Sequence, residues 1–275
     1  MTSGELRARM YGPQDLSSLP VFAGGFINFG YWRGIPLDGE LSAEQRISSQ
    51  QQLYRLVLRA LDLSSADRIL EVGCGLGLGC ALAAEEFGAS EVRGIDLVPD
   101  QVQRAERVNA TAMARRPGRL GFRAGSASAI PYPDGTFDAA MSIEAAQHFE
   151  DLPGFATEAS RVLVPGGRLV VTSFFATTAD SATRLPDLLE TFASGIDLAT
   201  PIDAPATALQ HAGFIDVDVR SIGEDVWPGL DRWISGTDYR DTWARNWLVA
   251  ARQGLLDYFV ISARNREVSI GATPG

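Results

Sequence analysis

Apolar and polar residues alternate along this chain in short blocks that predict a regular succession of strands and helices. Five apolar runs are short and nearly continuous, as in strands buried on both faces, and helical patterns precede the first run and separate most of the others. This alternation indicates an α/β fold with a mostly parallel sheet and helices on both faces. The strands are predicted at 68–73, 91–98, 120–127, 137–145 and 168–176, and the helices at 41–63, 78–89, 99–116 and 151–167.

The pattern changes after the fifth strand, where residues 176–200 and the tryptophan-rich residues 223–253 interrupt the alternation. The first 41 residues are also irregular and contain many glycines, prolines and aromatic residues. We therefore predict an N-terminal entry segment at 1–41 and one domain at 42–275. The entry segment and the two insertions are expected to form caps over the carboxyl rim of the sheet. The other regular elements are a helix and two strands, at 205–214, 215–222 and 255–265.

The charge of the chain excludes several classes of protein. The formal net charge is −10, so the chain lacks the basic face that binding to nucleic acid requires. All 24 basic residues are arginine, so neither a P-loop lysine nor a Schiff-base lysine is present. The chain has no basic leader with an apolar core and no apolar run of about 18 residues, so we expect a cytoplasmic protein without a membrane span.

The two cysteines, Cys74 and Cys80, lie inside the glycine-rich stretch RILEVGCGLGLGC at 68–80. Their spacing gives neither a disulfide framework nor a zinc site, and no metal site is expected. The stretch follows the first predicted strand and has glycines at alternate positions. Because glycine adopts positive φ readily and lets the backbone approach a ligand closely, we expect a ligand at this point.

The glycine stretch does not match the G-x-G-x-x-G fingerprint of dinucleotide-binding proteins in any register. Glu71 precedes the glycines at the carboxyl end of the strand, where α/β sheets bind their ligands. A carboxylate there repels a pyrophosphate, but it attracts a cation or accepts a hydrogen bond from an N–H. The sequence therefore predicts a ligand that carries an ammonium group and no phosphate.

The segment ILEVGCGLG resembles motif I of the class I S-adenosylmethionine (SAM)-dependent methyltransferases, and further motifs of that family follow in order. Asp96 ends the second strand, where the family's acidic residue holds the ribose hydroxyls. AGSASAIPYPDGTFDAAMS resembles the adenine loop and fourth strand, and ASRVLVPGGRLVVTSF resembles the helix, turn and fifth strand. The resemblance covers roughly residues 42–175. It implies a Rossmann-like, seven-stranded sheet with its last strand antiparallel, SAM as cofactor and S-adenosylhomocysteine as product.

The resemblance also assigns residues to the cofactor. The family often has Gly-Asp-Ala where this chain has Gly125-Ser126-Ala127, so the adenine contact is expected to be weaker and uncharged unless a neighbour compensates. The segment INFGYW, which ends at Trp32, resembles the entry segment of a subgroup that includes tocopherol and sugar O-methyltransferases of secondary metabolism. The implied cofactor-binding residues are Glu71, Gly73, Gly75, Gly77, Asp96, Leu97, Ser126, Ala127, Tyr31 and Ser142.

Two interpretations of the entry segment stay open. In the subgroup this segment folds over the methionine end of the cofactor, and Tyr31 then offers its π face or its hydroxyl to the sulfonium. The alternative is an aromatic anchor that packs the N-terminus onto the core. An irregular segment rich in aromatic residues is also a candidate contact between subunits of a homo-oligomer.

The candidate catalytic residues, Glu144 and His148, follow the fourth strand in SIEAAQHFED. The acceptor is expected there because the carboxyl ends of the strands face the crevice. An imidazole can take the proton of a hydroxyl, and in the subgroup a histidine in this stretch often does so. A non-catalytic His148 is the alternative. Glu144 can orient His148, bind the substrate or stabilise a developing cation.

Together these observations predict methyl transfer to a bulky, largely apolar small molecule of natural-product biosynthesis, with oxygen as the first-choice acceptor and His148 as the base. The first alternative is C-methylation of a terpenoid or indole-terpenoid alkene, with or without cyclisation. The second is a cyclase or binding protein that retains SAM as a structural ligand. Trp243 and Trp247 are four positions apart, so we expect them on one helix face, either in the core or in a substrate cage.

Overall fold

The computed structural model of this protein describes residues 21–267. Its centre is a seven-stranded sheet with the strand order β3-β2-β1-β4-β5-β7-β6. Strands β1 to β5 pair in parallel, and β7 runs antiparallel to both of its neighbours. The predicted α/β fold with an antiparallel last strand is therefore confirmed. The strands are β1 (Arg68–Val72), β2 (Glu91–Asp96), β3 (Leu120–Ala124), β4 (Phe137–Ile143), β5 (Leu163–Ala176), β6 (Ile215–Ser221) and β7 (Leu256–Arg264).

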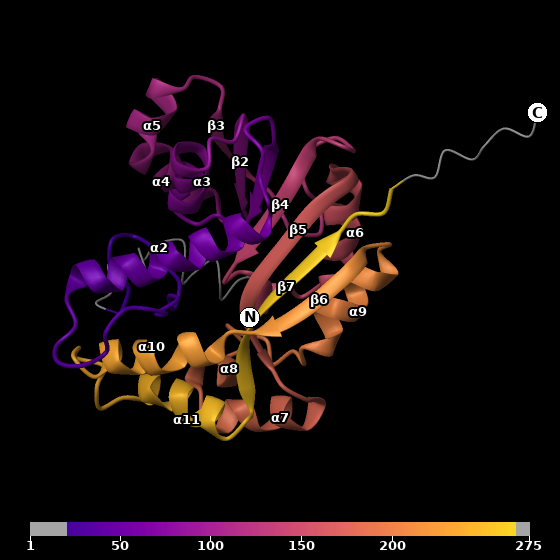
Figure 1. The fold of residues 1–275 in the computed structure, drawn as a ribbon. Helices are drawn as coiled ribbons and strands as arrows, with labels where there is room; N and C mark the ends of the chain where they lie inside the picture. Colours follow the sequence, from indigo (N-terminus) through magenta and orange to yellow (C-terminus); the bar gives the residue numbers. More distant parts are fainter. Residues whose placement is uncertain (1–20, 268–275) are drawn as a thin grey trace, which may run out of the picture.

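Helices cover both faces of the sheet (Figure 1). The first begins with a capping box, in which the Ser42 side chain accepts from the Gln45 N–H and the Gln45 side chain accepts from the Ser42 N–H. Helices α2 and α3 contribute to one apolar cluster of the core, and α6 and α9 contribute to a second. The helices of this layer are α2 (Ala43–Ala60), α3 (Leu78–Glu86), α4 (Pro99–Val108), α5 (Ala110–Arg115), α6 (Leu152–Val162) and α9 (Asp203–His211).

Two of the predicted helices differ from the observed ones. The helix predicted at 99–116 divides into α4 and α5 at Asn109, whose side-chain amide donates to the Leu76 carbonyl at 2.8 Å. Short polar side chains interrupt helices because they bond to nearby backbone groups. The helix predicted at 151–167 is shorter, because β5 already begins at Leu163 and carries a bulge against β4.

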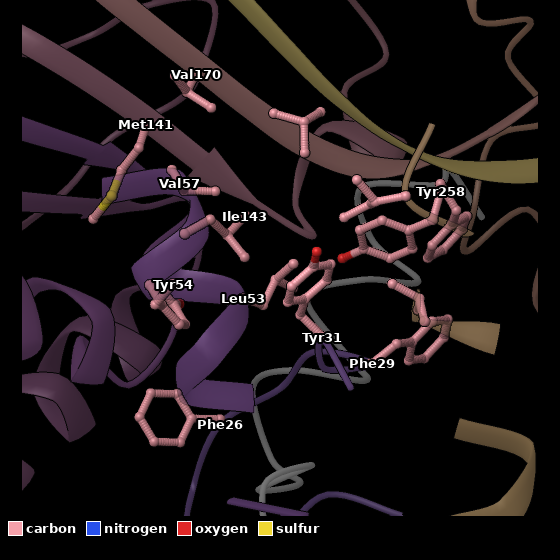
Figure 2. Packing of buried hydrophobic residues seen from close by; sticks show 14 of the residues in the cluster. Phe26, Phe29, Tyr31, Leu53, Tyr54, Val57, Met141, Ile143, Val170 and Tyr258 are labelled. Atoms are coloured by element: carbon pink, nitrogen blue, oxygen red, sulfur yellow. The ribbon is translucent and has the colours of Figure 1, made fainter. Parts of the chain in front are cut away.

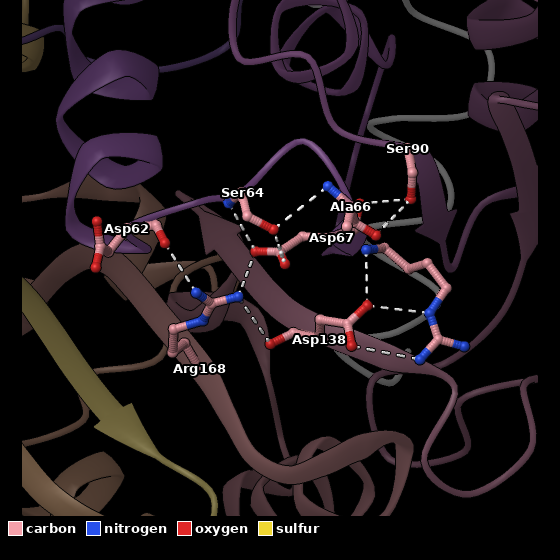
Figure 3. A network of polar contacts seen from close by, with 8 residues as sticks. Asp62, Ser64, Ala66, Asp67, Ser90, Asp138 and Arg168 are labelled. Atoms are coloured by element: carbon pink, nitrogen blue, oxygen red, sulfur yellow. Dashed lines mark hydrogen bonds and ion pairs between the residues drawn. The ribbon is translucent and has the colours of Figure 1, made fainter.

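A polar network joins β1, β4 and β5 at the amino rim of the sheet (Figure 3). Arg168 of β5 pairs with the Asp67 carboxylate and donates to the Asp62 carbonyl at 2.8 Å. Asp138 of β4 accepts from the Arg68 backbone N–H at 2.9 Å and from Arg68 Nε at 3.0 Å. These contacts tie three central strands together on the rim that carries no cap.

Three cap segments gather at the carboxyl rim, where Figure 1 shows α7, α8, α10 and α11 at one end of the sheet. The first insertion follows β5, and the second lies between β6 and β7. The third segment is the lid, which we define as residues 21–41. Residues 1–20 of the predicted entry segment lie outside the described residues. The cap elements are α7 (Ala179–Arg184), η3 (Leu185–Asp187), α8 (Glu190–Ala193), η4 (Gly223–Asp225), α10 (Trp227–Ile234), η5 (Trp243–Arg245) and α11 (Asn246–Arg252).

The prediction that Trp243 and Trp247 share a helix face is wrong. Trp243 lies in the 3₁₀ turn η5 and is 37% exposed, whereas Trp247 lies in α11 and is buried among aromatic rings. The two side chains diverge because a 3₁₀ turn has fewer residues per turn than an α-helix. Within residues 21–267 no helix is both long and apolar enough to cross a membrane.

Candidate active site

A cavity of about 350 Å³ lies at the carboxyl ends of β1, β2 and β4. This is the rim at which parallel sheets bind their ligands. The lid, the glycine loop after β1, the end of β2, the exit loop of β3 and the segment after β4 form its walls. The predicted site residues that line it are Gly73, Gly75, Asp96, Leu97, Ser126, Ala127, Glu144 and His148.

The glycine loop forms one wall of the cavity. Gly73 and Gly75 line it with left-handed backbone, at φ of 80° and 50°. A Cβ at Gly73 would stand 2.3 Å from the Ala145 Cβ, so only glycine fits at this position. Gly77 also has positive φ, but it lies outside the lining and begins α3, packed so closely that a Cβ would stand 2.2 Å from the Phe122 ring.

Asp96 is held at the end of β2 by two backbone donors. Its Oδ2 accepts from the Gly75 N–H at 3.0 Å, and its Oδ1 accepts from the Val98 N–H at 2.9 Å. Burial raises the pKa of this carboxyl, and the two backbone hydrogen bonds oppose the shift. A carboxylate oxygen has more than one acceptor site, so both oxygens can still accept from a ligand. Two adjacent hydroxyls, as on a ribose, match this arrangement.

Leu97 and the exit loop of β3 line the cavity next in sequence. Leu97 is 56% exposed, so its side chain is available to an apolar or flat group of a ligand. Ser126 Oγ lies 3.2 Å from Ser128 Oγ, and Ser128 also lines the cavity. A second hydroxyl is therefore present where the resembling family often has a carboxylate. Gln101 of α4, which is buried and lines the cavity, was not predicted, since a single polar residue in a helix gives no distinct signal.

Glu71 does not line the cavity but points into the core. Its Oε1 accepts from the Tyr54 hydroxyl at 3.0 Å, and its Oε2 accepts from the Cys80 thiol at 2.9 Å. Burial raises the pKa of Glu71 to about 7. Since Tyr54 lines the cavity, Glu71 supports the cavity wall from behind.

Ser142 also lies outside the lining and is fully buried. Its hydroxyl donates to the Val72 carbonyl at 2.9 Å. Because Val72 is the last residue of β1 and lines the cavity, this bond fixes the start of the glycine loop.

The structure corrects the expectation that Tyr31 faces the cofactor. Tyr31 is buried outside the cavity lining, and its N–H donates to the Ser49 carbonyl at 2.8 Å. Burial raises the pKa of its phenol, and a hydrogen bond to Asp225 adds to the rise. The lid covers the cavity with residues 25–27 instead.

Two buried ionisable side chains hold the lid at Phe29. Arg46 of α2 donates to the Asn28 carbonyl at 2.7 Å and to the Phe29 carbonyl at 3.0 Å. Glu144 Oε1 accepts from the Phe29 N–H and, at 2.6 Å, from the Tyr258 hydroxyl. Burial raises the pKa of Glu144 to about 8 and lowers the pKa of Arg46 to about 9. Glu144 therefore joins the cavity wall to the lid.

His148 contacts the first insertion through Nδ1. This nitrogen lies 2.9 Å from the Ile196 carbonyl oxygen and 3.3 Å from Asp197 Oδ1. Asp197 is buried, and its own N–H donates to the Thr191 carbonyl. The sequence analysis did not find Asp197, because it lies in an irregular cap far along the chain from His148.

The neighbouring Gln147 defines which nitrogen of His148 carries the proton. Gln147 Nε2 donates to the Glu144 carbonyl at 2.9 Å, and its Oε1 accepts from the Ser173 hydroxyl at 2.6 Å. These bonds fix the amide so that its NH₂ group faces His148 Nε2 at 3.2 Å. Nε2 is then the acceptor nitrogen, and Nδ1–H donates to Ile196. This is the tautomer that a general base at Nε2 requires.

The ionisable groups in the cavity wall are mostly acidic. Asp96, Glu144, Glu150 and Asp151 line it together with His148. No arginine lies among the described residues that line it, and the sequence contains no lysine. Such a cavity favours a cationic ligand and disfavours a phosphate.

Comparisons with known proteins agree with this geometry. The family model described as a methyltransferase domain matches residues 70–171. The chain is 33% identical over 224 residues to erythromycin 3''-O-methyltransferase of Saccharopolyspora erythraea, covering 77% of this chain and 69% of that protein. It is 30% identical over 205 residues to methyltransferase GfsG of Streptomyces halstedii, covering 74% and 70% of the two chains.

Two solved structures share the fold. Geranyl diphosphate C-methyltransferase from Streptomyces coelicolor A3(2), in complex with Mg²⁺, geranyl diphosphate and S-adenosylhomocysteine, superposes with a TM-score of 0.79 at 17% identity, over 96% of this chain and 98% of that one. The [4+2]-cyclase SpnF superposes with a TM-score of 0.72 at 24% identity, over 98% of both chains. The chain thus belongs to the class I SAM-dependent methyltransferases of the methyltransferase-domain family, and it is a SAM-using enzyme of secondary metabolism.

Proposed function

We propose that this enzyme transfers the methyl group of SAM to a hydroxyl oxygen of a bulky, largely apolar small molecule, with His148 as the general base. The observation that carries the proposal is one cavity lined by both Asp96 and His148, with His148 bonded as the Nδ1–H tautomer. The similarity of this chain to erythromycin 3''-O-methyltransferase supports an oxygen acceptor.

The residues at the cofactor end suit SAM. Asp96 has acceptor sites left on both carboxylate oxygens for the ribose hydroxyls of SAM. Leu97 and Ser126 line the cavity where they can contact the adenine ring. The glycine loop suits close approach of the methionine part, and the acidic lining suits its cationic groups. Bound there, SAM supplies an electrophilic methyl group on a positively charged sulfur.

His148 then handles the proton of the acceptor. The acceptor hydroxyl first displaces the Gln147 amide N–H from the single lone pair of Nε2. Nε2 then accepts the hydroxyl proton as the oxygen bonds to the methyl group, and Nδ1–H stays bonded to the Ile196 carbonyl. The positive imidazolium that results lies beside the Asp197 carboxylate, with Nδ1 and Oδ1 3.3 Å apart. Asp197 is therefore proposed as a positioning residue that stabilises the charged form of His148.

The charge of the cavity supports an acceptor without a phosphate. Asp151 adds an exposed carboxylate to the cavity wall, and no arginine lies among the described residues that line it. In the Streptomyces coelicolor structure the diphosphate is accompanied by Mg²⁺, and the described residues of this chain contain no group of three or more acidic, histidine or cysteine side chains that could hold a metal ion. The acceptor is expected to be neutral or cationic.

The test is transfer of a labelled methyl group. The enzyme is incubated with methyl-labelled SAM and a panel of phenols, terpene alcohols and glycosylated macrolides, and S-adenosylhomocysteine release is measured. An O-methyl group is cleaved from the product by hydriodic acid and a C-methyl group is not, so the label reports the acceptor atom. Absence of S-adenosylhomocysteine binding in calorimetry contradicts the proposal as a whole.

C-methylation of an alkene is the second candidate, and the aromatic rings of Phe26, Tyr54 and Phe149 in the cavity wall favour it because π faces stabilise a developing carbocation. Methyl transfer to an alkene needs no prior deprotonation, so His148 would act only on the product cation. A cyclase that retains SAM is the third candidate. It is distinguished by conversion of an added polyene with no loss of label from SAM.

A further inference from the structure

The cavity is too small for the cofactor and a bulky acceptor together. Its volume of about 350 Å³ lies near the lower end of the range of roughly 300–1,000 Å³ for sites that hold one small ligand. The predicted cofactor-binding residues line one end of it, namely Gly73, Gly75, Asp96, Leu97, Ser126 and Ala127. A bulky acceptor therefore needs further volume in contact with His148 and Glu144.

A group of six buried aromatic side chains lies where the three caps meet the sheet. We define this aromatic cluster as one ring from the lid, two from strands β5 and β7, one from α8 and two from the second insertion. Every member has less than 10% of its surface exposed. The members are Phe29, Phe174, Tyr258, Phe192, Trp227 and Trp247.

Phe29 is the lid's member of the aromatic cluster. Its ring stacks on Phe174 with centroids 5.5 Å apart and meets Trp247 edge-on at 5.0 Å and Trp227 at 6.0 Å. In Figure 2 the rings of Phe26 and Phe29 point away from each other. Phe26 lines the cavity, so one short piece of lid covers the cavity with one ring and enters the cluster with the other.

Glu144 separates the aromatic cluster from the cavity. It lines the cavity, and its Oε1 accepts from the Phe29 N–H and the Tyr258 hydroxyl. Movement of the lid that breaks the Phe29 N–H bond, together with the Arg46 bonds to the Asn28 and Phe29 carbonyls, leaves the Glu144 side chain held by the Tyr258 hydroxyl alone and withdraws the Phe29 ring. The space left behind adjoins the cavity and keeps Phe174, Trp227 and Trp247 as walls.

We propose that Phe29 occupies the acceptor's binding pocket in this conformation, and that the apolar part of the acceptor replaces the Phe29 ring when the lid opens. The proposal rests on the methyltransferase function proposed above. The pocket would take a neutral group at least one ring in size. Its walls are aromatic, and the indole N–H of Trp227 is already bonded to Asp257 at 3.0 Å. Phe29 is then a specificity-determining residue, because the acceptor binds only if its interactions with the pocket offset the free energy needed to displace the Phe29 ring.

Binding of 2-naphthol tests the proposal. This probe has a flat apolar body and one hydroxyl. Its binding is measured by calorimetry and by the change in emission of the five tryptophans, of which Trp227 and Trp247 line the proposed pocket. Phe29→Ala removes the occupying ring, so we expect 2-naphthol to bind at least about tenfold more tightly than in the wild type. Bound 2-naphthol should also change the affinity for S-adenosylhomocysteine, because the enlarged pocket adjoins the cavity.

Phe214→Ala is the matched control. Phe214 is also a buried phenylalanine, but it belongs to the second apolar cluster of the core. That cluster contains residues of α6 and α9 and no member of the aromatic cluster. The Phe214→Ala substitution also truncates a buried phenylalanine to alanine, but the space it leaves lies away from the cavity. We expect no change in tryptophan emission with 2-naphthol and no coupling to S-adenosylhomocysteine in this variant.

Phe29→Leu covers the case in which the alanine variant does not fold, and it should give a gain of about threefold. A change of less than twofold in a folded Phe29 variant, or an equal gain in Phe214→Ala with the same emission change, overturns the proposal. Failure of the proposed function is seen separately, as absence of methyl transfer from SAM by the wild type, since 2-naphthol binding is measured without turnover.

Discussion

The two ends of the cavity are built in different ways. At the cofactor end, the glycine loop, Asp96 and the exit loop of β3 lie at the ends of neighbouring strands, and main-chain groups fix them. At the acceptor end, His148 follows β4, but its partners come from the first insertion, and the roof comes from the lid. The cofactor end therefore depends on local backbone geometry, whereas the acceptor end depends on contacts between distant segments. Variants should separate the two.

His148→Ala should give the largest effect and confine it to the acceptor end. A positioned base contributes about 10²–10⁴ in rate, so kcat should fall by that factor. S-Adenosylhomocysteine affinity, measured by calorimetry, should stay within about twofold. His211→Ala, at the exposed end of α9, is the control and should leave both quantities unchanged. Continued SAM consumption with an altered product would instead favour C-methylation.

Asp96→Ala should give the converse result. Its carboxylate is proposed to accept two hydrogen bonds from the ribose, and hydrogen bonds to charged groups contribute about 1.5–3 kcal/mol each. S-Adenosylhomocysteine affinity should therefore fall at least about tenfold. The melting temperature without ligand should also fall, because the Gly75 and Val98 N–H groups lose their acceptor. Asp100→Ala, an exposed carboxylate in the first turn of α4, serves as control. Equal affinity in the two variants would contradict the assignment of this end to the cofactor.

Asp197→Asn sharpens the assignment of the acceptor end. The amide keeps the size of the side chain but removes the charge that faces His148 Nδ1. We expect kcat to fall about tenfold with little change in S-adenosylhomocysteine affinity, because the imidazolium loses its counter-charge. Partial recovery in Asp197→Glu would show that charge matters, and Asp203→Asn, an exposed residue of α9, provides the control. A loss of stability without a rate defect would leave Asp197 a purely structural residue.

Glu144→Gln should change the pH dependence of stability most visibly. The pKa of Glu144 is about 8 in the folded protein and 4.5 ordinarily, so the folded state binds its proton more tightly between these values. The contribution of Glu144 to the free energy of unfolding should therefore be fully present below about pH 4.5 and be lost as the pH rises to 8. Urea unfolding at pH 5 and pH 8 should show a smaller fall in Glu144→Gln than in the wild type. Glu71, with a pKa of about 7, contributes a similar fall to both proteins.

Most of the fold and the cofactor end follow from the sequence because their signals are local. Buried parallel strands are recognised in the sequence as apolar runs. Glycine is required at position 73 because the backbone there has positive φ and the Ala145 side chain leaves no room for a Cβ. Glu71 was nonetheless expected among the cofactor-binding residues, although its side chain points into the core. Adjacent strand residues point to opposite faces, and Glu71 lies on the face covered by α2 and α3.

The acceptor end was less predictable because its contacts join irregular segments. The lid was expected over the cavity, but with Tyr31 rather than Phe26 facing it. Positive φ at Gly24 and Gly25 turns the chain just before Phe26, and positive φ at Gly30 turns it just before Tyr31, and periodicity cannot follow such turns. The pairing of His148 with Asp197 likewise has no signature in a single sequence, since nothing local relates the two positions.

The buried thiols give the protein an internal reporter of motion at the cofactor end. Cys74 lies in the cavity wall and Cys80 in α3, and they are the only two cysteines of the sequence. Both thiols are buried, and burial raises the pKa of Cys80 well above its ordinary value, so a thiol reagent reacts only when local opening exposes and ionises the thiol. The rate of thiol labelling therefore reports local opening of the protein around the glycine loop, in solution and without an introduced probe. Bound S-adenosylhomocysteine should slow this labelling.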